Sequence, residues 1–338
     1  MLHTNDAKPK PAIGISRQQE LQLMVHYMNK TSRTLAQDAE ELPVWTEAIP
    51  EEAMRHDFLM DGLLGMASLH FACYNSHSWR QYTEFSIQYQ NSGLKKYNDA
   101  LGNITEDNCT ALFAFSVVLN VMAIALPNTN PDSAASAYTE TMMTMLELVR
   151  GIGLIHATSV TMLRTGKLAP LFRYIPGEAE PDDETKAALE ILRQHANSLM
   201  NSGSINEGRH TIYLAGIRAL EVAFGCIILS NHFAPIIGWP TWIWPDEHRD
   251  ELIRLIQHGD VMARVILMHY GVLLLHIRHH WWGKQTGISL IDDVAISVDA
   301  AGPSWAPLTR WPREIARQTK HRDQGALHVG YAFSETLL

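Results

Sequence analysis

Cysteine is scarce in this sequence: Cys73, Cys109 and Cys226 are the only three among 338 residues. An odd number without close spacing fits neither a disulfide framework nor a cysteine-rich zinc site. Each of the three is better explained as a small apolar residue inside a core. The sequence therefore predicts no metal site.

Positive charge is also in short supply. Lysine and arginine together number 27 against 36 acidic residues, which gives a net charge of -9, and no dense Lys/Arg run occurs. This balance excludes a broad electrostatic footprint for nucleic acid, so we expect no direct contact with DNA or RNA. Residues 1–16 contain no apolar signal-peptide core, which predicts a protein that stays inside the cell, in the cytoplasm.

Long apolar runs and alternating patterns are missing too. The longest apolar run starts at Val265 and is interrupted by His269 and His276, whereas a bilayer needs about 20 apolar residues in a row. We therefore expect no membrane span. No stretch shows the alternation typical of a series of strands, so the predicted fold class is all-α.

What the sequence does contain is helical periodicity along most of its length, which predicts a single large helical domain of about a dozen helices. Pro9, Pro11 and Gly14 predict a disordered lead over residues 1–16, and Ser16 with Gln19 predicts a capping box that opens the first helix. The helical domain is expected over 17–315 and a tail over 316–338. Later helices are expected near 57–74, 79–101, 105–126, 134–151, 183–200, 210–230, 246–258 and 288–300.

The stretch from Val261 to Gly283 is expected to form the central helix, because apolar residues fill nearly every position from Val265 to Ile277. Its end carries imidazoles and indoles, which suit the wall of a pocket for a bulky apolar ligand but equally suit ordinary packing. A proline-rich aromatic segment lies upstream at 233–247. The candidate ligand-binding residues are Trp239, Trp242, Trp244, Met268, His276, Trp281 and Trp282.

Histidine is abundant, with 17 residues, and His279 and His280 are the candidate hydrogen-bond donors for catalysis. The alternative is that these imidazoles cap the last carbonyls of the helix and lie in water. No carboxylate or cysteine joins them at ligand spacing, so we favour that alternative over a metal site. Asp292 and Asp293 are expected on a solvated helix face, and His56 and His70 as satisfied core histidines.

Seven local phrases occur in an order that resembles the C-terminal effector region of fungal zinc-cluster transcription factors, in the sterol-uptake-regulator branch. The resemblance covers roughly residues 18 to 315 and implies a helical domain, an apolar pocket partly built from the C-terminal helices, and a homodimer. The phrases lie at Val44–Pro50, His56–His70, Thr105–Ser116, Leu148–Ile152, Ala169–Phe172, Ala263–Gly283 and Leu308–Pro312.

Members of that branch are understood to bind a sterol that controls nuclear entry, and zinc-cluster factors read DNA through six cysteines that hold two zinc ions. None of the residues before the first expected helix is cysteine. Two functions therefore compete. One is a ligand-responsive transcription regulator in the nucleus that works with a DNA-binding partner protein.

The other function is a cofactor-free cyclase, of the Diels-Alderase type, in a secondary-metabolite pathway. Such an enzyme orients a terpenoid, sterol or polyketide and needs no nucleophile, metal or redox cofactor. We favour this interpretation, because a transcription factor without DNA-binding residues needs an extra assumption. The reaction class also suits a sequence in which no G-x-S-x-G, Walker, dinucleotide or H-E-x-x-H motif occurs. A passive carrier of hydrophobic small molecules is the third possibility.

Overall fold

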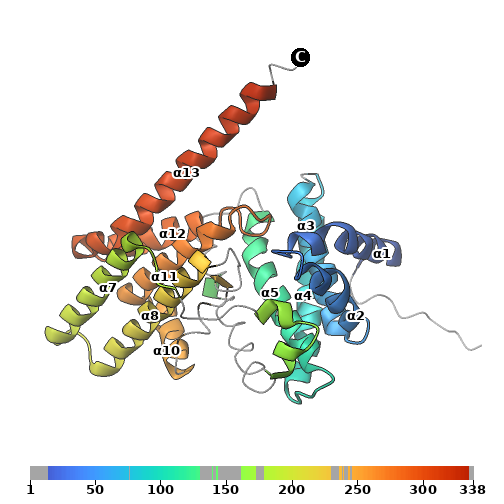
Figure 1. Ribbon diagram of the computed structural model, residues 1–338, viewed down its shortest axis with the longest axis horizontal. Coiled ribbons are helices and arrows are strands. Elements are labelled where there is room, and N and C mark those ends of the chain that lie inside the picture. The colour runs from blue at the N-terminus through green and yellow to red at the C-terminus, as the bar shows by residue number, and fades with distance from the viewer. Residues whose placement is uncertain are drawn as a thin grey trace, which may run out of the picture. The chain divides into compact units, whose positions relative to one another are not determined.

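Helices make up the regular structure of this protein, and the residues that the computed structural model describes include no strand. Those residues are 14–75, 77–129, 139, 142–143, 161–172, 179–229, 236–237, 239, 243 and 246–334. The all-α prediction is confirmed (Figure 1). The chain divides into two compact units, Met1–Val118 and Leu119–Leu338, and the division falls inside helix α5 (Cys109–Ala125). The prediction of one domain over 17–315 stays a prediction.

The first unit begins with the predicted capping box. The Ser16 hydroxyl accepts a hydrogen bond from the Gln19 backbone N–H at 3.3 Å, and the Gln19 side chain accepts from the Ser16 backbone N–H at 2.9 Å. Helix α1 (Arg17–His26) then changes pitch, first to a π-helical turn, η1 (Tyr27–Thr31), and then to a 3-10 turn, η2 (Ser32–Thr34). We had expected one regular helix to about residue 39.

Helices α3 (Asp57–Tyr74) and α4 (Trp79–Leu101) pack along each other and form the core of the first unit. A second π-helical turn, η3 (Val44–Ala48), and the short α2 (Ile49–Ala53) precede them. Phe115 of α5 lies against both helices: a Cβ at Gly62 or Gly93 would come within 2.8 Å of its ring. Glycine at these two positions therefore lets the three helices approach closely.

Asp61 is buried between α3 and α4, where its Oδ2 accepts hydrogen bonds from Ser92 Oγ and Lys96 Nζ, each at 2.8 Å. We expect Asp61→Asn to lower the free energy of unfolding by about 1–2 kcal/mol, because the half-buried Ser92 and Lys96 side chains lose a charged acceptor. Urea denaturation followed by circular dichroism measures the loss. Asp99→Asn, at an exposed position of α4, is the control and should change stability by less than about 0.5 kcal/mol; equal losses would contradict the assignment.

The second unit surrounds α11 (Val261–Leu274), the expected central helix, which ends at Leu274 and not at the expected Gly283. Twelve of its fourteen residues are buried, and the Asp260 side chain caps it by accepting from the Ala263 N–H at 2.9 Å. Helices α8, α10, α12 and α13 pack against it. The elements are η4 (Leu126–Thr129), η5 (Ala169–Phe172), α7 (Asp183–Asn201), α8 (Glu207–Leu229), α10 (Asp246–Gln257), η7 (Leu275–Ile277), α12 (Thr286–Ala300), η8 (Pro303–Trp305) and α13 (Ala306–Ser334).

The expected tail over 316–338 is helical up to Ser334, because α13 continues well beyond the LTRWP phrase that we had taken as its end. Pro312 removes one backbone hydrogen bond inside this helix. Side-chain contacts hold the helix on both sides of that proline. Trp311 Nε1 donates to Glu184 Oε1 at 3.1 Å, and Lys320 Nζ forms an ion pair with Asp292 Oδ2 at 2.7 Å.

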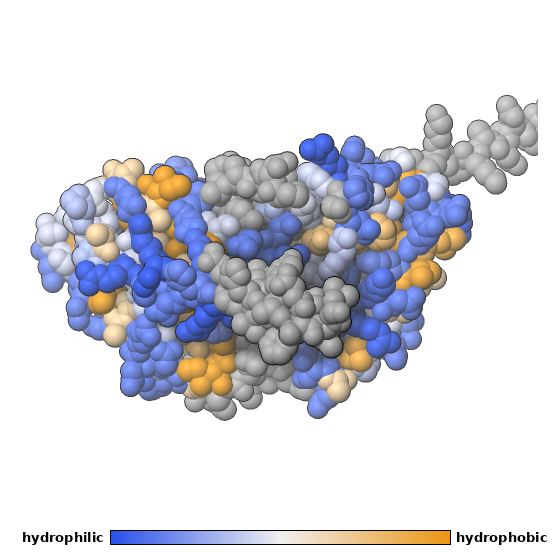
Figure 2. Space-filling model, turned by 90° about the horizontal axis from the view of Figure 1, so that it is seen from above, coloured by the Kyte–Doolittle hydropathy of each residue, from blue (hydrophilic) through white to orange (hydrophobic). Residues whose placement is uncertain are grey.

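Two described helices are long and apolar enough to cross a membrane, Cys109–Thr129 and Glu207–Ile228, and a bent pair, Glu247–Gln257 with Val261–Ile277, would make a third if it were one span. In the first, 83% of the apolar window is buried inside the protein, and in the second 56%. Figure 2 shows mostly hydrophilic residues on the face it presents, with separate hydrophobic patches. The absence of a membrane span stays a prediction.

Candidate functional site

Trp239 and Tyr270 form the centre of the candidate site in the second unit. Trp239 comes from the aromatic segment before α10, and Tyr270 lies in the middle of α11. Their rings stack, with centroids 4.6 Å apart and planes inclined by 24°. Both side chains are essentially inaccessible to solvent, and burial raises the pKa of the Tyr270 hydroxyl, which therefore stays protonated. Trp239 was a predicted ligand-binding residue, whereas Tyr270 was not.

Trp281 and Trp282 are buried at the end of α11, as the sequence suggested for an aromatic tip. Asn128 of η4 fixes this segment: its Nδ2 donates to the Trp282 carbonyl at 2.8 Å and to Thr286 Oγ1 at 3.0 Å. Gly283 follows because a Cβ there would lie 2.2 Å from the Ile277 carbonyl oxygen. The chain thus turns back on η7 and holds the two indoles in the interior.

The candidate histidines are placed differently. His279 is exposed, and so is His276, whereas the half-buried His280 stacks on Trp282 with ring centroids 5.1 Å apart. Met268 is fully buried within α11. Trp242 and Trp244 lie outside the described residues. Of the predicted site residues, the structure therefore brings His280 and Trp282 together. Trp239 instead stacks on Tyr270, which the sequence did not single out.

Sequence reasoning missed His269 and Trp311. His269 of α11 is buried, its Nδ1 donates to the Val265 carbonyl at 2.9 Å, and its ring stacks on Trp311 of α13 with centroids 5.5 Å apart. Burial lowers the pKa of His269 to about 4, against a smaller opposite effect of the Val265 carbonyl. The LTRWP phrase draws attention to Trp311, but nothing in that phrase predicts which helix the indole contacts.

Neutral His269 makes the stability of the protein depend on pH. Its pKa is about 4 when folded and about 6.5 when unfolded. Between these values the unfolded chain takes up a proton that the folded chain does not, so lowering the pH from 6.5 to 4 costs roughly 3 kcal/mol of stability from this group.

We expect His269→Phe, which keeps an aromatic ring beside Trp311, to remove this part of the acid destabilisation. Denaturant titrations at several pH values between 4 and 7 measure it as a difference between variant and wild type. His258→Phe replaces an exposed histidine and should leave the acid dependence of the wild type in place. Identical pH dependence of His269→Phe and wild type would refute the role of His269.

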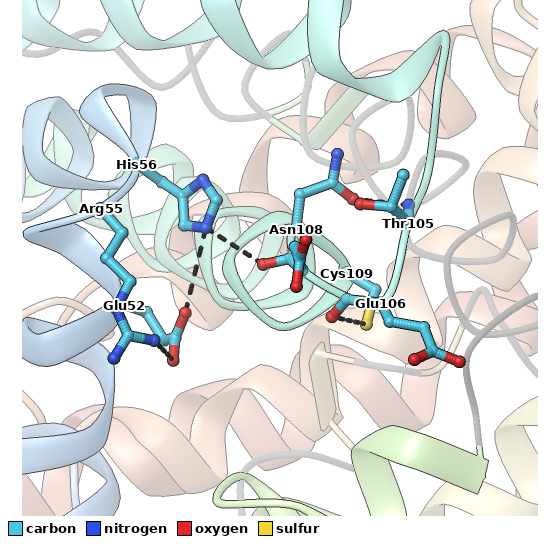
Figure 3. Close-up of polar contacts among 8 residues, drawn as sticks. Glu52, Arg55, His56, Thr105, Glu106, Asn108 and Cys109 are labelled. Atoms are coloured by element: carbon cyan, nitrogen blue, oxygen red, sulfur yellow. Dashed lines mark hydrogen bonds and ion pairs between the residues drawn. The ribbon is translucent and has the colours of Figure 1, made fainter.

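A separate polar cluster lies in the first unit, around His56 at the start of α3 (Figure 3). His56 Nε2 is 3.2 Å from the Asp107 carbonyl and 4.0 Å from Glu52 Oε2. Both partners are acceptors, so Nε2 carries the proton. The buried Cys109 donates to the Glu106 carbonyl at 3.6 Å. These interactions join α2 to the turn before α5. We therefore assign His56 a structural role.

The other histidine of α3, His70, is buried, and its Nδ1 lies 2.8 Å from Thr31 Oγ1. The structure thus gives both His56 and His70 hydrogen-bond partners, as expected. Asp292 is exposed and paired with Lys320, whereas Asp293 is half-buried and accepts hydrogen bonds from Thr139, which a solvated face did not predict. Within the described ranges, no three His, Cys, Asp or Glu side chains gather closely enough to hold a metal ion.

A comparison with known proteins finds one partial relative among its matches. The chain is 32% identical over 114 residues to a protein of Gibberella zeae named Zn(2)-C6 fungal-type transcription factor. The aligned stretch covers 32% of this chain and 23% of that protein, so the chain spans less than a quarter of the relative's length. No family model matches the chain. The similarity is consistent with a domain related to fungal transcription factors.

Proposed function

We propose that this chain is a ligand-responsive regulatory domain of the fungal zinc-cluster transcription-factor type, which binds a hydrophobic small molecule in its second unit. The similarity to the Gibberella zeae factor supports the regulatory class. The observation that supports ligand binding is the stacking of Trp239 on Tyr270 of the central helix, since both side chains are fully buried. Large rigid aromatic surfaces with few polar groups suit the binding of an apolar molecule.

The placement of the histidines favours binding over catalysis. A cyclisation gains from a donor held in a water-excluded site beside the substrate, whereas His279 is exposed. His280 is the one candidate donor next to a buried indole, because it stacks on Trp282. Because of this contact, our second proposal is a cofactor-free cyclase. Its substrate class would be a terpenoid, sterol or polyketide.

Deletion of the gene in its host separates the two proposals. A regulator predicts altered transcript levels for a defined group of genes, restored by the wild-type gene. It also predicts nuclear accumulation of the tagged full-length protein and association with DNA through a partner or through its own chain. Unchanged transcript levels after deletion would contradict the proposal of a transcription regulator.

The cyclase predicts instead that an uncyclised precursor accumulates after deletion and that purified protein converts it without added cofactor. His280→Phe, which keeps the stacking on Trp282 but removes the donor, should then slow this conversion, while the exposed His279→Phe should not. A precursor left untouched by wild-type protein would rule out the enzyme.

A further inference from the structure

Trp239 carries a polar atom that the fold leaves without a partner. Its side chain is 1% exposed, and Nε1 is buried with no hydrogen-bond acceptor among the residues that the structure describes. The neighbouring described residues of the segment, Ile236, Ile237 and Ile243, are buried and apolar. A buried donor without an acceptor is uncommon in native proteins because it loses its hydrogen bond to water. This N–H therefore needs an explanation.

Trp311 shows that the fold can supply an acceptor to an indole that stacks on α11. Both indoles stack on a ring of α11, Trp239 on Tyr270 and Trp311 on His269. Trp311 Nε1 donates to Glu184 Oε1 at 3.1 Å, so the chain supplies an acceptor for that indole. No described residue supplies an acceptor for Trp239, and a bound ligand with an oxygen atom can supply one.

We propose that Trp239 is the specificity-determining donor of the ligand site, and that it selects an apolar ligand carrying an acceptor oxygen, a carbonyl or hydroxyl, over a pure hydrocarbon. The proposal rests on the proposed function, since it concerns the same site. The indole face packs on Tyr270 while Nε1–H donates to the ligand oxygen. One hydrogen bond in a dry apolar site also fixes the orientation of a ligand that has no other polar group.

Matched probes test this donor. Ketone and hydrocarbon pairs of the same skeleton, cyclododecanone with cyclododecane and 5α-cholestan-3-one with 5α-cholestane, are titrated against the full chain. We expect the wild type to prefer the ketone of at least one pair, and Trp239→Phe to lose about 3- to 10-fold in affinity for that ketone, the range for one net hydrogen bond. Hydrocarbon affinity should stay within 2-fold, because phenylalanine keeps the stacking.

Trp45→Phe is the matched control. Trp45 lies in the first unit and is fully buried, and its Nε1, like that of Trp239, has no acceptor within the described part of the chain. Its variant should bind every probe as the wild type does. In spectra of chain labelled with 15N at the indoles, the signal that disappears in Trp239→Phe should move downfield when the preferred ketone binds.

The outcomes separate this inference from the proposed function. Equal affinity of the wild type for ketone and hydrocarbon, or equal losses for both in Trp239→Phe, overturns the donor role and leaves an apolar site in place. A Trp239 signal that ignores a bound ketone overturns it as well. If the wild type binds no probe, the ligand part of the proposed function fails together with the donor, whereas altered transcripts after gene deletion would still support a regulator.

Discussion

Trp282→Ala should lower the free energy of unfolding by about 3–5 kcal/mol, the usual cost of truncating a fully buried tryptophan. Its indole is inaccessible to solvent and stacks on His280, and its carbonyl is held by Asn128. The loss has two parts, the apolar surface that no longer packs and the cavity that rigid neighbours cannot fill. Denaturant unfolding of wild type and variant, followed by circular dichroism, gives the difference directly.

Trp79→Ala is the control for this prediction. Trp79 begins α4 in the first unit, is only partly buried, and has the Arg80 guanidinium 5.1 Å from its ring centroid. Its truncation should cost about 1 kcal/mol or less. If Trp282→Ala costs no more than Trp79→Ala, the Trp282 indole is not packed in the interior of the second unit.

Gly287→Ala is expected to cost about 3 kcal/mol. Helices α11 and α12 cross so closely that a Cβ at Gly287 would lie 2.7 Å from the Gly271 carbonyl oxygen and 2.8 Å from the Leu275 backbone nitrogen. The first atom belongs to the backbone of α11 and the second to the backbone of η7, so neither can move aside as a flexible side chain would. Overpacking of this kind separates the helices and disturbs the residues that position Trp282.

A second glycine-to-alanine change controls for the effect of alanine itself. Gly208 lies near the start of α8, where a Cβ would meet only Asn206 Oδ1 at 3.7 Å. Gly208→Ala should be neutral or slightly stabilising, because alanine favours the helix. Equal stabilities of the two variants would mean that α11 and α12 do not touch at this point.

Much of the helical framework could be predicted from the sequence, because local signals determine it. The bounds of α3, α4, α7 and α12 agree within a few residues with the expected helices, since apolar periodicity and flanking Pro or Gly mark them. The capping box at Ser16 was also local. Helix α13 was not predicted to its full length, because Pro312 reads as a stop and only side-chain contacts with α7 and α12 reveal that the helix continues.

The candidate site was less accessible to sequence reasoning for the same physical reason. The burial of Trp281, Trp282 and Met268 follows from their apolar neighbours, and the structure agrees. The stacking of Trp239 on Tyr270, or of His269 on Trp311, joins residues 31 or more positions apart, and no local pattern encodes such pairs. Sequence also gave no way to tell that Trp239 Nε1 lacks an acceptor while Trp311 Nε1 has one.

The central claim is that the buried aromatic site of the second unit binds an apolar small molecule. Native mass spectrometry of the full chain, purified from a fungal host without detergent, tests it most directly. We predict that a fraction of the protein carries one small molecule per chain, which is extracted by organic solvent and contains at least one oxygen. Protein that shows only its bare mass, and that gains no adduct after incubation with cyclododecanone or 5α-cholestan-3-one, would contradict the claim.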